Sequence, residues 1–273
     1  MNNISFGQYY PANSLIHSLD ARFKVICAFL YIVCSFLCKN ILSFAALLAS
    51  AALLVAISGI PPKILLKSLR PIIFILLFTV VINMFWTSGE NLVFSWWKIR
   101  IYYEGIMNAL FIAVRIVVLI VGTSIFLTYT TTPIALTDAL ESLLSPLKVL
   151  RAPVHEFAMM ITIALRFIPT LTEETNRIMA AQKARGADFT TGSIFKRARA
   201  LIPILVPLFV SAFRRADELA TAMECRCYHG GEGRTRLNIP HSRPRDYVML
   251  LLIVAFGAGL ILINIYGIGY TMK

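Results

Sequence analysis

The stretch NILSFAALLASAALLVAISGIPP, residues 40–62, decides the class of fold because it contains no charged residue. A helix needs about 20 apolar residues to cross the hydrocarbon core of a membrane. The whole chain is 58% hydrophobic and only 15% charged, which lies outside the range of soluble domains. The sequence therefore predicts an integral membrane protein.

Four further segments are candidates for membrane spans. Residues 71–89 and 247–272 are uncharged. Residues 23–38 form a short span whose Lys24 would have to snorkel to water, and residues 105–132 carry Arg115 inside the apolar run. We expect an all-α membrane protein with about five transmembrane helices. The first twenty residues lack the apolar core of a cleavable signal peptide, so the first span is expected to direct insertion.

Basic residues in the short connections predict the orientation. Arg22 and Lys24 precede the first span, and Lys63, Lys67 and Arg70 lie between the second and third. A dense basic set follows the fourth span, whereas the connections expected outside are nearly balanced in charge. We expect a cytoplasmic N-terminus and an external C-terminus. This bias accounts for much of the net charge of +12, so no nucleic-acid partner is predicted.

The chain is expected to have three parts: an N-terminal membrane part with four spans over residues 1–132, a cytoplasmic coupling domain over residues 133–246, and a last span over residues 247–273. The middle part reads as long, bent, amphipathic helices. Pro133 favours a helix start after Thr131 or Thr132, and Pro146 an interruption.

Two long helical segments follow in this middle part. The first begins after Pro153, should bend near Pro169 and should stop at Gly186. The second has an uncharged segment at 200–213, too short to span a membrane, and continues as an amphipathic helix towards residues 228–231.

Each long segment ends on an arginine between small residues. KARGA contains Arg185 and ECRCY contains Arg226. The helix dipole favours a cation at this end, and an arginine at an interface can form bidentate pairs with carboxylates.

Two other interpretations of the second end are weaker. Cys225-x-Cys227-x-His229 has no second ligand pair for a structural zinc ion, and GGEGRTR lacks the spacing of a phosphate-binding loop. We therefore predict no metal site and no nucleotide hydrolysis by this chain.

Three charged residues are expected to be structural. An arginine within a span is either functional or paired, and for Arg115 both interpretations stay open, the structural one being that it faces the coupling domain or an acidic group. Arg166 is expected to be solvated or to contact lipid headgroups, and Glu224 to neutralise neighbouring arginines.

Nearly the whole chain resembles the transmembrane T component of energy-coupling factor (ECF) transporters, the modular ABC importers of vitamins and metal ions. The resemblance rests on YYPANSLIHSLDARFKV, MMITIALRFIPTLTEETNRIMAAQKARGADF and LVPLFVSAFRRADELATAMECRCY. It implies a non-catalytic subunit of the bacterial or archaeal plasma membrane. ATP and Mg²⁺ would be bound by two partner ATPases, and a membrane-embedded S component would bind the vitamin or other micronutrient.

The resemblance also implies roles for individual residues. The family's two Ala-Arg-Gly motifs, each of which docks into an ATPase, correspond to Ala184-Arg185-Gly186 and Cys225-Arg226-Cys227. The second motif departs from the pattern, which puts in doubt a tight turn that needs glycine after Arg226. The surface that contacts the S component is expected to comprise Ile202, Pro203, Leu205, Val206, Pro207, Leu208 and Phe209.

Two other functions are open alternatives. A membrane-embedded enzyme acting on a lipid-linked substrate would need clustered carboxylates or a paired nucleophile and base, but the acids here are scattered. A channel or secondary carrier would need polar residues in the spans or inverted repeats.

Overall fold

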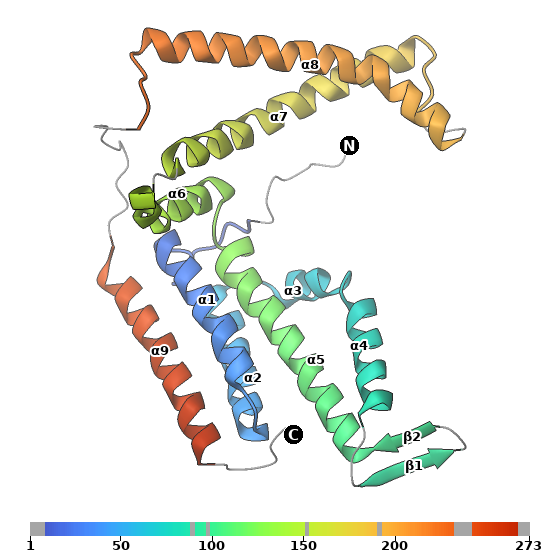
Figure 1. Ribbon diagram of the computed structural model, residues 1–273, viewed down its shortest axis with the longest axis vertical. Helices are drawn as coiled ribbons and strands as arrows, with labels where there is room; N and C mark the ends of the chain where they lie inside the picture. The colour runs from blue at the N-terminus through green and yellow to red at the C-terminus, as the bar shows by residue number, and fades with distance from the viewer. Residues whose placement is uncertain are drawn as a thin grey trace. The chain divides into compact units, whose positions relative to one another are not determined.

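The computed structural model describes residues 9–87, 91–96, 99–150, 153–189, 193–231 and 242–266, and Figure 1 shows the chain. The described elements are α1 Ala21–Leu37, α2 Ile41–Ser58, α3 Pro62–Leu69, α4 Ile73–Trp86, β1 Leu92–Trp96, β2 Ile99–Tyr102, α5 Tyr103–Thr123, the π-helix η1 Ser124–Tyr129, α6 Pro133–Leu143, the 3-10 helix η2 Ser145–Leu150, α7 Val154–Ala184, α8 Ile194–Cys225 and α9 Pro244–Ile265. The predicted all-α fold is confirmed, apart from a small antiparallel hairpin of β1 and β2 that was not predicted from the sequence.

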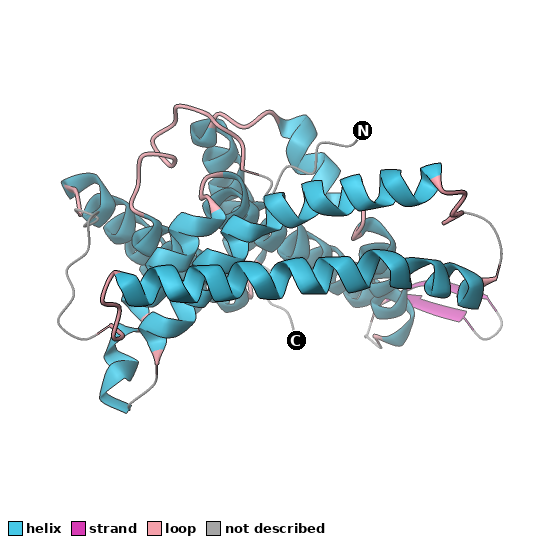
Figure 2. Ribbon diagram, turned by 90° about the horizontal axis from the view of Figure 1, so that it is seen from above, coloured by secondary structure: helices cyan, strands magenta, loops and turns pink. Residues whose placement is uncertain are grey.

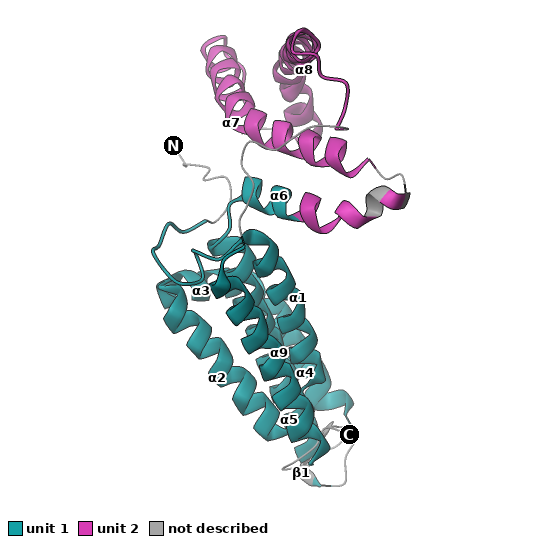
Figure 3. Cartoon of the chain, turned by 90° about the vertical axis from the view of Figure 1, so that its left-hand side faces the viewer, with its two compact units in different colours: residues 1–139, 240–273 teal, residues 140–239 magenta. Residues whose placement is uncertain are grey.

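The chain divides into two compact units, coloured separately in Figure 3. Unit 1 comprises Met1–Ala139 and Pro240–Lys273, and unit 2 comprises Leu140–Ile239. The last helix, α9, therefore belongs to the same unit as the N-terminal helices, although more than a hundred residues separate it from them in sequence.

Unit 1 is built around α1, which packs against α9, α5 and η1, while α2 packs against α5 and α9. The buried side chains between these helices are mainly aliphatic and aromatic. The rings of Tyr31 and Phe126 lie 6.2 Å apart, and Phe44 stacks on Phe111 at 4.6 Å. The apolar faces that allow these helices to enter a membrane thus also form a packed interior.

Four of the described helices are long and apolar enough to cross a membrane, and the pair α3 and α4, bent by 63°, raises the number to five. Three of these, α2, α5 with η1, and α9, lie on predicted spans. The bent pair takes the place of the predicted third span. The helix α1 is shorter, at 17 residues. The helix α7, which was predicted to be cytoplasmic, is also long and apolar enough to cross a membrane.

The expectation that Lys24 snorkels to water is wrong. Its side chain is only 3% exposed, and Nζ donates to the carbonyls of His17 and Thr130 at 3.2 and 2.8 Å. Two carbonyl acceptors compensate the ammonium group for its lost hydration. Lys24 thereby joins the segment before α1 to the end of η1.

A buried carboxylate connects the starts of α1 and α9. Asp246 is 1% exposed, and its two oxygens accept from the backbone N–H groups of Asp20 and Arg243 at 3.0 and 2.7 Å. The side chain of Asp20 in turn accepts from Arg22 N and caps α1. The motif HSLDARFK is therefore a structural junction in this chain.

The turn between α1 and α2 is held by polar groups from other helices. Arg115 Nη2 donates to the Cys38 carbonyl at 2.9 Å, and its guanidinium lies over the rings of Phe36 and Phe44. Asn264 donates to the Leu37 carbonyl at 2.6 Å. In the part of the chain that the structure describes, Arg115 thus contacts a backbone carbonyl and two aromatic faces and forms no ion pair with an acidic group.

The predicted helix boundaries of the middle part are largely confirmed. Thr132 Oγ1 accepts from Ala135 N at the start of α6, which ends at Leu143 before Pro146. The helix α7 begins directly after Pro153 and continues through Pro169 without interruption. Pro203 and Pro207 lie inside one continuous helix, α8, and Figure 1 shows this helix changing direction in its N-terminal half.

Candidate functional site

The candidate site is built on the helices α7 and α8, which pack against each other within unit 2. Their 31 and 32 residues make each helix about 47 Å long. Glu174 and Arg215 join them through an ion pair at 2.7 Å, and Ile204 is buried. The helices run in opposite directions, so the C-terminal end of α7 and that of α8 lie at opposite ends of the pair (Figures 1 and 2).

The C-terminal end of α7 is a tight reversal of the chain around Arg185. Arg185 closes the helix with φ −87° and ψ 7°, and Gly186 follows in the left-handed region at φ +87°. Gly186 N donates to the Lys183 carbonyl and Ala187 N donates to the Gln182 carbonyl, both at 3.0 Å. These two bonds are those of a Schellman motif, which satisfies carbonyls that the helix end leaves without partners.

The C-terminal end of α8 repeats this geometry around Arg226. Arg226 has φ −93° and ψ 15°, and Cys227 follows at φ +55°, the one non-glycine residue with positive φ in the described ranges. Cys227 N donates to the Glu224 carbonyl at 2.8 Å, and Tyr228 N to the Met223 carbonyl at 3.0 Å. The tight turn that the replacement of glycine put in doubt is therefore formed with cysteine.

The two ends differ in their surroundings. A Cβ atom at Gly186 would have no atom within 4 Å. After the second end, a Cβ at Gly231 would lie 2.5 Å from His155 Cδ2, and His155 Nδ1 is 3.0 Å from Glu141 Oε1. The chain that follows Arg226 is thus packed against the first turn of α7, whereas the turn at Arg185 extends into open space.

Both predicted motifs are exposed. This holds for Ala184, Arg185 and Gly186 as well as for Cys225, Arg226 and Cys227. An exposed guanidinium at the tip of a helix can reach a partner without unfolding any part of unit 2. Since the tips lie at opposite ends of the helix pair, they can bind two separate partners.

The residues predicted to contact an S component lie along α8. Six of them are exposed and one is partly buried: Ile202, Pro203, Leu205, Val206, Pro207 and Phe209 are exposed, and Leu208 is intermediate. Phe209 is 62% exposed and stacks on Phe213. The result is a largely exposed apolar stretch of α8, in which Ile204 is the buried residue.

The remaining candidate residues lie on the surface. Arg166 on α7 and Glu224 in the last turn of α8 are both exposed. Cys225 and Cys227 are exposed free thiols, and His229 is exposed as well. Within the described ranges, no three histidine, cysteine or acidic side chains are arranged to hold a metal ion.

Sequence reasoning missed three features of this site. It considered Glu174 among several acids for the arginines of α8 but did not identify its pairing with Arg215. It also missed the His155–Glu141 contact and the left-handed conformation of Cys227. The repeated arrangement of a helix, an arginine and a small residue was the signal that could have predicted the second Schellman turn.

The chain is similar to known transporter components. A match to the family described as "Cobalt transport protein" (CbiQ) covers residues 12–237. The energy-coupling factor transporter transmembrane protein EcfT of Ruminiclostridium cellulolyticum is 50% identical over 97% of this chain and 98% of its own length. The chain belongs to the EcfT family.

Other EcfT proteins show similar identity. The protein of Acidaminococcus fermentans is 51% identical over 87% of this chain and 88% of its own length. That of Bacillus subtilis is 48% identical over 86% of this chain and 89% of its own length. The resemblance inferred from the sequence motifs is thereby confirmed, and as an EcfT family member the chain is a transmembrane component of an ECF transporter.

Proposed function

We propose that this chain transmits ATP-driven motion from two cytoplasmic ATPase subunits to a substrate-binding S component during uptake of a vitamin or another micronutrient. The observation that carries the proposal is the pair of matched helix ends, each presenting an exposed arginine, at opposite ends of α7 and α8. Two separated tips suit two ATPases. Membership of the EcfT family supports the same role.

Each arginine would bind its ATPase through carboxylates or backbone carbonyls. A guanidinium presents five donors in a planar fork, so it can form two parallel hydrogen bonds with one carboxylate. The Schellman turn fixes the backbone on both sides of the arginine, which reduces the conformational entropy lost on docking. ATP and Mg²⁺ would be bound entirely by the ATPases, and this chain would carry out no chemistry.

The apolar face of α8 would contact the S component. Leu205 and Phe209 lie four residues apart and are both exposed, so they share one face of the helix. Aliphatic and aromatic side chains can adapt to several partner surfaces more easily than fixed polar contacts can. Because the face lies on the helix that ends at Arg226, motion imposed at that tip would reach the S component directly.

The membrane arrangement completes the proposal. The basic residues around α1 and α3 favour a cytoplasmic location for this end of unit 1, with the N-terminus inside and the C-terminus outside a bacterial or archaeal plasma membrane. Unit 2 would lie on the cytoplasmic side, where the ATPases are. The S component would determine which substrate is imported.

The experiment that tests this proposal compares two variants, a double arginine variant and a single phenylalanine variant, by two measurements: the partners that co-purify and substrate uptake. The full chain is co-expressed with its ATPases and S component, and each partner is quantified after purification of the complex. Arg185→Ala with Arg226→Ala should lose the ATPases and uptake, since removing one partner of a buried ion pair costs about 3–5 kcal/mol, roughly 100- to 5,000-fold in affinity. Phe209→Glu should lose the S component but keep both ATPases.

Two matched controls accompany these variants. Arg177→Ala removes an exposed arginine from the C-terminal third of α7, and Phe195→Glu changes an exposed phenylalanine near the start of α8. Both should leave the complex intact. Wild-type uptake by the double arginine variant would rule out docking through the two tips.

A further inference from the structure

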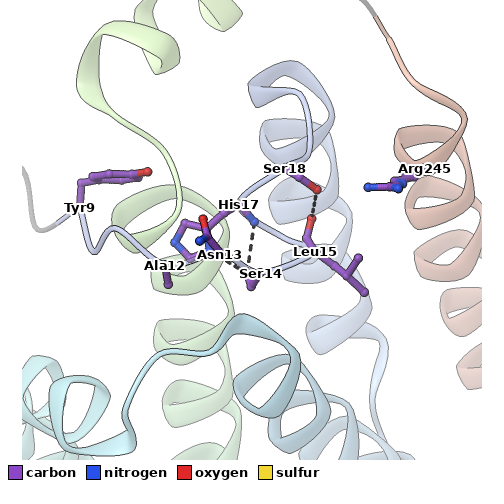
Figure 4. A pocket seen from close by; sticks show the side chains of 8 residues that line it. All are labelled: Tyr9, Ala12, Asn13, Ser14, Leu15, His17, Ser18 and Arg245. Carbon is purple, nitrogen blue, oxygen red and sulfur yellow. Dashed lines mark hydrogen bonds between the residues drawn. The ribbon is translucent and has the colours of Figure 1, made fainter.

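Unit 1 contains a cavity of about 520 Å³ that is separate from the helix ends of unit 2. It lies between the segment that precedes α1 and the first turn of α9 (Figure 4). Tyr9, Asn13, Ser14, His17 and Ser18 form one side, and Arg245 approaches from the other. In Figure 4 the Arg245 side chain points towards Ser18. The volume suits a small ligand or part of a larger one.

The N-terminal side of this cavity is fixed by hydrogen bonds. Ser14 Oγ lies 2.7 Å from His17 Nδ1, and His17 Nε2 is 2.8 Å from the Tyr10 carbonyl. The carbonyl can only accept, so Nε2 carries the proton and donates. The Tyr9 ring packs edge-on against the imidazole. These contacts fix the N-terminal side of the cavity in the absence of a ligand.

The charge of the lining favours an anion. Arg245 brings a full positive charge, and none of the described residues that line the cavity is acidic. The nearby carboxylate of Asp246 already accepts from two backbone N–H groups. In the part of the chain that the structure describes, the Arg245 guanidinium and the Asn13 amide make no hydrogen bond, so both can donate to a ligand.

The surroundings favour a lipid as the source of the anion. The cavity lies where α1 and α9 begin, next to exposed apolar side chains of the same helices and the preceding segment. Leu15, Tyr247, Val248 and Leu251 are all exposed. A ligand with a charged head and an apolar tail can fill the cavity and cover this surface together.

We propose that this cavity binds the phosphate of an anionic phospholipid headgroup, with Arg245 supplying the charge and Asn13 a neutral donor. The acyl chains would lie along the exposed apolar residues of α9. Such a lipid would join the N-terminal segment to α9, next to the junction of Asp20 and Asp246. This site is independent of the proposed ATPase docking.

Native mass spectrometry of the full chain in a non-ionic detergent tests the site. The protein is incubated with equal amounts of phosphatidylglycerol and phosphatidylcholine, and the bound lipids are counted. Wild-type protein should prefer phosphatidylglycerol. Arg245→Gln should weaken that preference about five-fold, because one arginine near an anionic surface contributes about 1 kcal/mol. Asn13→Leu should weaken it as well, without a change in charge.

Arg70→Gln is the matched control, since it removes an exposed arginine that caps the C-terminal end of α3 and does not line the cavity. It should keep the wild-type preference. An equal loss in Arg70→Gln would mean that general surface charge attracts the lipid and would overturn the site, as would an unchanged preference in both Arg245→Gln and Asn13→Leu. Displacement of phosphatidylglycerol by millimolar inorganic phosphate would overturn the assignment to a lipid.

Discussion

The ends of α7 and α8 have nearly the same backbone but different sequences and different support. Both close on an arginine, and both form the two hydrogen bonds of a Schellman turn. The first end uses Gly186 and is surrounded by open space, whereas the second uses Cys227 and continues to Gly231, which is packed against His155. The comparison shows that the arginine and the turn are shared, while the residue that makes the turn is not.

The two ends also differ in the conformational energy of the residue that follows the arginine. A residue with a Cβ atom in the left-handed conformation is destabilised by about 1–2 kcal/mol relative to glycine. The second end carries that cost at Cys227, and the packing of Gly231 on His155 can compensate for it. We therefore expect the first end to depend on its glycine and the second end to depend on its neighbours.

Replacing Gly231 should have the largest effect. In Gly231→Ala the new Cβ would lie 2.5 Å from His155 Cδ2, so the ring or the backbone must move, and overpacking of this kind costs about 1–3 kcal/mol. Thermal unfolding of the full chain in detergent measures the loss. Gly231→Ala should cost less stability in a His155→Ala background than in the wild-type chain, because the ring it meets is gone. An equal cost in both backgrounds would refute the contact.

Substitutions at the two turn positions should have smaller and unequal effects. Gly186→Ala should lower the free energy of unfolding by about 1 kcal/mol, since a Cβ atom there strains only the backbone. Cys227→Ala should leave the free energy of unfolding nearly unchanged, because cysteine already has a Cβ atom. Cys227→Gly should stabilise its turn by up to about 1 kcal/mol. Hydrogen exchange of the Ala187 and Tyr228 amides, which donate the outer bond of each turn, reports these changes. Equal effects of alanine at the two positions would contradict the comparison.

Much of the fold could be predicted from the sequence because its signals are local. Apolar runs predicted the helices α2, α5 and α9, and Pro133, Pro153 and Gly186 predicted helix boundaries within one or two residues. The second long helix was expected to reach residues 228–231 but ends at Cys225. The arginine between small residues was the available signal for a turn at Cys227, but no glycine marks that end.

The features that the sequence could not predict depend on contacts between distant segments. Lys24 is buried because the carbonyl of Thr130 lies beside it, and Arg115 finds the carbonyl of Cys38 at the end of another helix. The 63° bend between α3 and α4 and the pair Glu174–Arg215 are likewise results of packing. The predicted domain boundaries and the roles of the two arginine tips stay predictions.

The most direct measurement of docking at the tips uses the cysteines of the chain itself. Cys225 and Cys227 are exposed and flank Arg226, whereas Cys27, Cys34 and Cys38 are buried and should react little with a bulky, charged maleimide. Labelling is followed with the chain alone and in complex with the ATPases, and Ala184→Cys reports the first tip in the same way. Docking predicts that the ATPases slow labelling at both tips at least tenfold. Unchanged labelling rates in an intact complex would contradict it.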